Sequence, residues 1–222
     1  MERSVLINKV KTRIDEVSAS GDIIVEVGVE NTKPYDSIID ELLDESALEV
    51  LLKAPFYRLN VSSGNVTATA SSSTKKSVLM TIGSTTDVTN KADNQTGTIV
   101  LPLDFLRIVS LRLSDWEQPV TELALPSDEI AQLQSNKHLR GSAAKPVGIL
   151  KKTAQGYVIN YYSSSTHSVD EFLYIKKDTA QNIADTQLID AMVWICAAKT
   201  LGVLNEPTLS NLCYENAKGL MV

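Results

Sequence analysis

The chain has 222 residues, 43% hydrophobic and 22% charged, which is enough apolar material for the core of an ordinary globular protein. Its 21 basic and 27 acidic residues give a formal net charge of −6. This charge argues against nonspecific nucleic-acid binding as the main activity, because that binding needs a positive field. The two cysteines and two histidines lack the short spacings of a structural zinc site, and we expect both thiols to be reduced and buried.

The sequence predicts neither a secretory leader nor a membrane span. The first twenty residues mix charged and apolar side chains, without the continuous apolar run that a signal peptide needs. The most apolar stretch, residues 188–204, is interrupted by Asp190 and Lys199.

The first quarter of the chain predicts two helices. Residues 2–19 place apolar side chains at helical intervals with charged residues between them. A short strand or an extended linker is expected over residues 23–29. The second helix follows Pro34 and closes before Pro55, with acidic residues near its start, where they complement the helix dipole.

The middle of the chain changes to a period of two, which predicts strands. The strand-like segments are FYRLNV, NVTATA, SVLMTIG, GTIVLPLDFLRIVSLRL, VGILKK, GYVINYYS and EFLYIKK. Residues 71–76 and 84–97 are polar enough to form long loops. One short helix is expected from Pro126 to about His138, with Ser127 as its N-cap and with Ile130 and Leu133 on its apolar face.

Helices return at the end of the chain. Residues 185–204 carry one apolar stripe with hardly any helix breaker before Gly202. Pro207 starts a final helix that runs to about Lys218, where Gly219 is expected to end it before the apolar tail.

These elements predict an α+β fold in which a terminal helical bundle carries a β-rich insertion. The expected division is N-terminal helices over residues 1–55, a β-rich middle with one short helix over 56–180, and C-terminal helices over 185–222 that pack with the N-terminal pair. Strict βα alternation and repeats of 20–50 residues are absent, which argues against Rossmann, barrel and solenoid folds.

No combination of residues predicts an active site or a cofactor. The ten glycines form neither a dinucleotide-binding nor a P-loop motif. His167 lies near Ser163, Ser164, Ser165 and Asp170, but a turn between two strands explains this stretch better than a catalytic triad does. The adjacent carboxylates of the second helix diverge by about 100° and are typical of a solvated face. Tyr157, Tyr161, Tyr162 and Tyr174, expected on two adjacent strands, could form a binding surface or pack across strands.

The order of the segments resembles that of a family of phage proteins. A helical pair, a β-rich middle containing LPLDFLRIVSLRL, and a closing pair containing TQLIDAMVWICAAKTLGVL resemble the head-to-tail adaptors of short-tailed bacteriophages, of the tail-tubular-A or gatekeeper type. The serine- and threonine-rich β segments and ILKKTAQGYVINYYSSS are similar to the ring proteins of crAss-like phages.

This resemblance implies a structural virion protein rather than an enzyme. About twelve copies would form a ring below the portal, in the neck or tail of the virion, after assembly in the bacterial cytoplasm. The implied partners are the portal protein and other tail or ring proteins. DNA would pass through the channel without sequence-specific binding, and no membrane and no cofactor would be involved.

Two sets of residues are candidates for the surfaces of such a ring. Carboxylates on the second helix could line the channel and repel DNA, or could form the solvent face of that helix; they are Asp36, Asp40, Glu41, Asp44, Glu45 and Glu49. Leu220, Met221 and Val222 could dock into the portal or a neighbouring subunit, or could contact their own subunit.

Two other functions are compatible with the sequence. The first is a carbohydrate- or protein-binding β module with helical decoration, whose exposed tyrosines would bind the ligand. The second is a hydrolase that uses His167 or a carboxylate pair.

Overall fold

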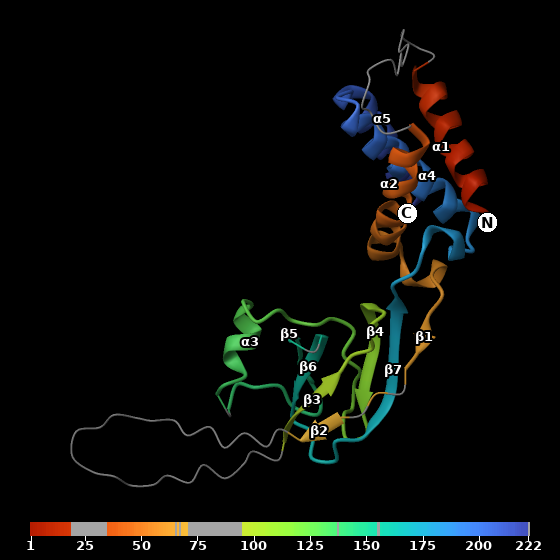
Figure 1. Cartoon of the computed structure of the whole chain (residues 1–222). Helices are drawn as coiled ribbons and strands as arrows, with labels where there is room; N and C mark the ends of the chain where they lie inside the picture. The colour runs from red at the N-terminus through yellow and green to blue at the C-terminus, as the bar shows by residue number, and fades with distance from the viewer. Residues whose placement is uncertain are drawn as a thin grey trace, which may run out of the picture. The chain divides into compact units, whose positions relative to one another are not determined.

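A computed structural model gives the fold (Figure 1), and it describes residues 1–18, 35–64, 66, 68–70, 95–136, 138–154 and 156–221. The expected strand or linker at 23–29, the segment SVLMTIG, the loop 71–76 and most of the loop 84–97 lie outside the described residues. The chain divides into two compact units. We call Met1–Asn60 with Ile175–Val222 the helical unit, and Val61–Tyr174 the β unit.

The helical unit is built from both ends of the chain. Its helices are α1 (Arg3–Ser18), α2 (Tyr35–Lys53), α4 (Thr186–Val203) and α5 (Pro207–Leu220), with short 3-10 turns at Phe56–Arg58 and Ala180–Asn182. The predictions of all four helices are confirmed. The helix α4 contacts α1, α2 and α5, and is therefore the centre of the bundle.

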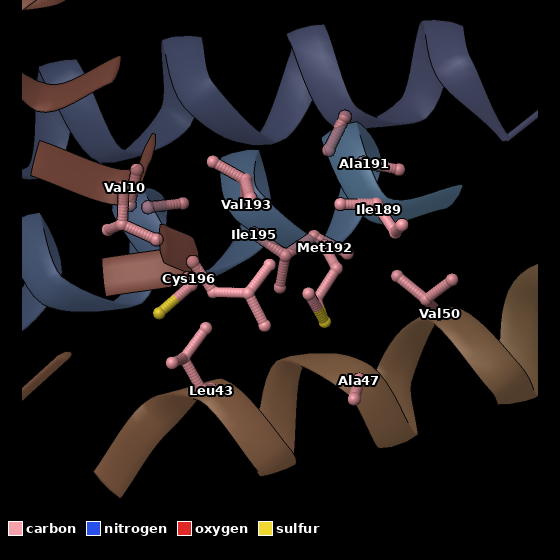
Figure 2. Close-up of a cluster of buried hydrophobic side chains, with 14 of the residues drawn as sticks. Val10, Leu43, Ala47, Val50, Ile189, Ala191, Met192, Val193, Ile195 and Cys196 are labelled. Atoms are coloured by element: carbon pink, nitrogen blue, oxygen red, sulfur yellow. The ribbon is translucent and has the colours of Figure 1, made fainter. Parts of the chain in front are cut away.

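The apolar stripe of α4 explains this central position. Eleven of its residues are buried, including Met192, Ile195 and Cys196. Figure 2 shows Leu43, Ala47 and Val50 of α2 projecting toward these residues, and all six belong to one buried cluster. Burial of such a stripe stabilises helices that would be marginal alone.

The β unit contains two antiparallel sheets. The strands of one are β2 (Ala68–Ala70), β3 (Thr96–Val100), β6 (Gly156–Tyr162) and β5 (Gly148–Thr153), in that spatial order. In the other, β7 (Val169–Lys176) lies between β1 (Ser62–Ser63) and β4 (Phe105–Leu113). In the chain, N-terminal and C-terminal helices flank these antiparallel sheets, which confirms the α+β class.

The register of the strands follows the alternation of their side chains. Ile99 of β3 and Leu150 of β5 lie opposite Ile159 of β6, and Ile159 and Tyr161 are fully buried. Residues of both sheets share one core cluster. The period of two in GYVINYY is therefore the pattern of a strand with one face in that core.

Several local predictions are wrong at the edges of elements. FYRLNV is not a strand, because Phe56–Arg58 forms a 3-10 turn after Pro55. Thr96 and Gly97 belong to β3 rather than to a loop, since they pair with Tyr162 and Tyr161. The segment from residue 97 to 113 is two strands separated by a turn in which the Phe105 N–H donates to the Pro102 carbonyl.

The short helix α3 (Glu129–Leu133) is smaller than expected, and Asp128 rather than Ser127 holds the N-cap position. The Asp128 carboxylate accepts a hydrogen bond from the Leu125 N–H and does not cap the helix. Ile130 and Leu133 stay exposed. Because its apolar face is not buried, little tertiary packing stabilises further turns of this helix.

The final helix runs past Gly219 and ends at Leu220. Leu220 packs against the core of the helical unit, and its carbonyl oxygen accepts a hydrogen bond from Arg58. These contacts outweigh the tendency of glycine to end a helix.

Candidate interaction surfaces

Most of the acidic side chains of α2 are held by cations of the same unit. Arg3 of α1 donates to the Asp40 carboxylate, to the Asp40 carbonyl oxygen at 2.6 Å and to the Asp44 carboxylate at 3.0 Å. Asp44 also accepts a hydrogen bond from the Ala180 N–H, at 3.1 Å. The Arg3 guanidinium thus connects α2 to α1, and the Ala180 N–H connects α2 to the turn at Ala180–Asn182.

Lysines hold the remaining paired carboxylates. Lys11 pairs with Asp36. Lys199 of α4 lies 2.8 Å from Glu45 and 3.1 Å from Glu49, and its side chain is 14% exposed. Five of the six predicted carboxylates therefore pair within the helical unit, and the sixth, Glu41, also has an interaction.

The pKa values report this pairing. Partial burial by itself would raise the pKa of Asp44, but the Ala180 N–H and Arg3 outweigh it and hold the pKa below its usual value. Burial is likewise outweighed at Glu49, whose pKa is lowered by Lys53 and Lys199. These carboxylates stay ionised while the cations beside them reduce their outward field.

The carboxylate oxygens nevertheless remain accessible to solvent. The side chains of Asp36, Asp40, Asp44 and Glu45 are about half exposed or more. The face of α2 is therefore a hydrated, partly neutralised surface that also holds the bundle together.

The first two residues of the predicted docking tail pack within the helical unit. Leu220 and Met221 are partly buried against the core of the helical unit, while Val222 is outside the described residues. Arg58 donates to the Leu220 carbonyl at 2.9 Å and to both carboxylate oxygens of Asp185, at 2.8 and 3.3 Å. Of the two possibilities for the tail, the structure therefore places these two residues in the intramolecular contact.

Asp185 links this contact to the start of α4. Its carboxylate accepts the Leu188 N–H at 3.0 Å and so caps the helix. The hydrogen bonds from Arg58 and from Leu188 lower its pKa. The Arg58 side chain is only 9% exposed, less than that of any other cation in the ion pairs described for the helical unit.

The four tyrosines do not lie on two adjacent strands, and packing explains most of them better than a shared binding surface does. Tyr157, Tyr161 and Tyr162 lie on β6, whereas Tyr174 lies on β7 of the other sheet, so the two strands are not adjacent. Tyr161 and Tyr174 are buried, and only Tyr157 is substantially exposed. Aromatic packing accounts for the buried pair, because Tyr161 meets Trp116 edge-on and Tyr174 stacks with Phe172. Of the four tyrosines on which the β-module alternative was based, Tyr157 is thus the exposed one.

The turn around His167 has a structural explanation. His167 has a positive φ of 51°, and its Nδ1 lies 2.6 Å from the Tyr161 hydroxyl. Asp170 pairs with Arg112 at 3.7 Å. The Asp115 carboxylate accepts the Ser165 N–H at 2.7 Å and holds the turn. A triad needs one ring nitrogen of the histidine for the serine and the other for the aspartate. Because Tyr161 already occupies Nδ1 of His167, the geometry supports packing rather than a triad.

Both cysteines are free and buried in the helical unit. Burial raises the pKa of Cys196 to about 12 and that of Cys213 to about 11. Such thiols behave as small apolar side chains and not as nucleophiles.

The described part of the chain contains neither a candidate metal site nor a candidate membrane span. No group of three or more His, Cys, Asp or Glu residues there could hold a metal ion. None of the described helices is long and apolar enough to cross a bilayer. Compared with known proteins, the chain matches no family model and no curated protein.

One surface was missed by the sequence analysis. Between β4 and β5 the β unit exposes four apolar side chains, of which only Ile130 and Leu133 were predicted to lie on the apolar face of a helix; the four are Leu125, Ile130, Leu133 and Leu139. Apolar residues at such intervals occur both in cores and on surfaces, so only the structure shows that these four side chains are exposed.

Proposed function

We propose that this chain is a structural subunit of a phage head-to-tail connector, one copy in a ring of about twelve below the portal. The observation that carries the proposal is the construction of the helical unit from both ends of the chain, with the β unit inserted between α2 and α4. This is the arrangement that the resemblance to tail-tubular-A and gatekeeper adaptors implies.

The distribution of charge supports a role beside DNA without tight binding. By sequence, the helical unit holds 11 basic and 17 acidic residues, while the β unit holds 10 of each. The entire net charge of −6 therefore belongs to the helical unit. A duplex that passes a hydrated acidic surface gains no counterion release and can slide along it.

Binding to a portal protein tests this proposal. The purified chain is mixed with portal rings from the same phage, and the complex is separated by gradient sedimentation and imaged after negative staining. We expect a ring of added density on one face of the portal and no retention of duplex DNA by the free chain. Failure to sediment with the portal at any mixing ratio would contradict the proposal.

A further inference from the structure

The β unit carries an open groove between α3 and the start of β5. Its volume is about 380 Å³, and both charged residues in its lining, Glu122 and Asp128, are acidic. The apolar part of the lining includes Val147 and Ile130, and Ile130 is 47% exposed. Glu122 forms no ion pair with another described residue, whereas most carboxylates of α2 are paired. The groove therefore suits an occupant that carries an apolar group beside a positive charge.

The hairpin of β5 and β6 ends in such a combination. Lys152 of β5 lies directly opposite Tyr157 of β6, so both side chains project from the same face of the hairpin. Tyr157 is 45% exposed, although Ile159 and Tyr161, which follow on that face, are fully buried. Lys152 is exposed as well, and neither its ammonium group nor the Tyr157 hydroxyl bonds to another described residue. We call Lys152 and Tyr157 the hairpin tip.

The hairpin tip and the groove are complementary in charge and in chemistry. The Lys152 ammonium is a partner for the Glu122 carboxylate. The phenol ring of Tyr157 can cover the exposed side chain of Ile130 while its hydroxyl donates to a carboxylate of the groove. Tyrosine is also among the residues that most often anchor protein interfaces.

One chain cannot bring its own hairpin tip to its own groove. All six residues of β5 pair with β6, which fixes the length of the strand. The bridge between Ala124 and Ile149 is parallel, so Glu122 lies level with Val147. Five residues of strand, about 16 Å, therefore separate the level of Glu122 from Lys152. Because both surfaces belong to this rigid part of one unit, a contact between them needs a second chain.

This arrangement has the geometry of a head-to-tail interface. Two different, complementary surfaces at opposite ends of one strand leave a free hairpin tip and a free groove after each association step. Such a series of subunits closes into a ring when the rotation between neighbours allows it, whereas a surface that binds its own copy stops at a dimer.

We propose that the hairpin tip of one copy binds in the groove of a second copy, with Tyr157 on Ile130 and Val147 and with Lys152 facing Glu122. The inference rests on the proposed function and deepens it, since it names a contact between neighbouring subunits of the ring. It assigns this surface of the β unit to a neighbouring subunit and not to the portal.

Cysteine cross-linking between two full-length chains tests the contact without changing the residues that make it. One chain carries Ala154→Cys beside the hairpin tip, and the other, with a longer tag, carries Glu129→Cys beside Ile130; both positions are exposed, and the native cysteines are buried. The matched control acceptor is Glu117→Cys, an exposed glutamate outside the groove. With a short bismaleimide, we expect about tenfold more mixed dimer with Glu129→Cys than with Glu117→Cys. Equal yields would overturn the inference.

Substitutions of the contact residues supply a second readout. Tyr157→Ser in the donor should lower the yield of mixed dimer about tenfold. Lys152→Glu should lower it about fivefold, and Glu122→Lys in the acceptor should restore it. The matched control is Lys151→Glu, because Lys151 lies opposite Val158 and projects from the other face of the hairpin. An equal loss with Lys151→Glu, or no recovery with Glu122→Lys, would overturn the proposed pairing.

A chain that carries both Ala154→Cys and Glu129→Cys tests the direction of assembly. Its cross-linked products should form a ladder of dimers, trimers and larger species, because every copy offers one hairpin tip and one groove. A ladder that stops at the dimer, or a link formed inside one chain, would contradict the head-to-tail contact.

These results can be separated from those for the proposed function, because the cross-link forms whether or not a portal is present. Portal binding without the ladder would leave the connector proposal standing and reject this interface. The ladder without portal binding would keep the interface and reject the connector proposal.

Discussion

The helical unit and the β unit treat their charged and apolar side chains differently. In the helical unit, Arg3, Lys11 and Lys199 pair with most of the acidic residues of α2, and the apolar tail packs on the core. In the β unit, the region between β4 and β5 leaves the apolar side chains of Leu125, Ile130 and Leu139 exposed.

A strong charge pattern in the sequence therefore need not be a surface that is free to bind a partner. The acidic helix is the strongest charge feature of the chain, yet its carboxylates are used to join α1, α2 and α4. The exposed apolar side chains of the β unit, in contrast, lie on a segment without a strong pattern in the sequence.

The largest expected effect comes from the core of the helical unit. Leu43→Ala removes a fully buried side chain and should lower the free energy of unfolding by about 2–5 kcal/mol. Denaturant unfolding can be followed in this unit by Trp194, with Trp116→Phe as the background. Labelling of Cys196 and Cys213 by a thiol reagent should accelerate in parallel, since both thiols are buried in the same cluster.

The matched variant Ile159→Ala instead removes a buried side chain from the core of the β unit. It should lower the denaturant midpoint of the transition reported by Trp116 in a Trp194→Phe background. The rate of thiol labelling should change much less. Equal shifts of both tryptophan transitions by each variant would show that the two cores do not behave as separate clusters.

The second largest effect is expected at Arg58. Arg58→Ala leaves the Asp185 carboxylate and the Leu220 carbonyl without their buried partner, which should cost about 2–3 kcal/mol in unfolding experiments. Arg112→Ala in the β unit is the control, because Arg112 is half exposed and lies 3.7 Å from Asp170. If Arg58→Ala lowers the free energy of unfolding no more than Arg112→Ala does, the hydrogen bonds of Arg58 to Asp185 and Leu220 do not stabilise the unit as expected.

The free energy of unfolding of the helical unit should fall at acid pH and stay nearly constant around neutral pH. The folded pKa values of Asp185, Asp44 and Glu49 are lowered, so the unfolded chain binds more protons below their ordinary values of 3.8 and 4.5. Their stabilisation is complete above about pH 5 and is lost as the pH falls through the folded values. Asp185→Asn should make the stability of this unit less dependent on pH between 5 and 2, as measured by urea unfolding followed by Trp194. An unchanged slope would contradict the assignment.

The smallest effect is expected on the outer part of the acidic face. Glu45→Gln should change the free energy of unfolding by no more than about 0.5 kcal/mol, because the Glu45 side chain is 63% exposed and Lys199 keeps Glu49 as a partner. A thermal melt at low and at high salt measures it. A loss above 2 kcal/mol would mean that the outer carboxylates, and not only Glu49, hold α2 to α4.

The regular elements could be predicted because their periodicity is long and unambiguous. The stripe of α4 and the alternation in GYVINYY each follow one geometry over several residues. Short segments could not be predicted this way. FYRLNV has the composition of a strand, but Pro55 and the ion pair of Arg58 place it in a turn against the helical unit.

The candidate site was predictable only in part. The sequence places the carboxylates of α2 on one helix, but it cannot show that Arg3 and Lys199, 37 and 154 residues away from their partners, neutralise them. Burial of Tyr161 and exposure of Ile130 also depend on which elements pack together, and the same residue types occur on both kinds of surface.

The native mass of the purified chain, alone and with a portal protein, tests the account most directly. We expect rings of about twelve subunits, or a complex of that stoichiometry formed only on the portal. A chain that remains a monomer at high concentration and ignores the portal would contradict it.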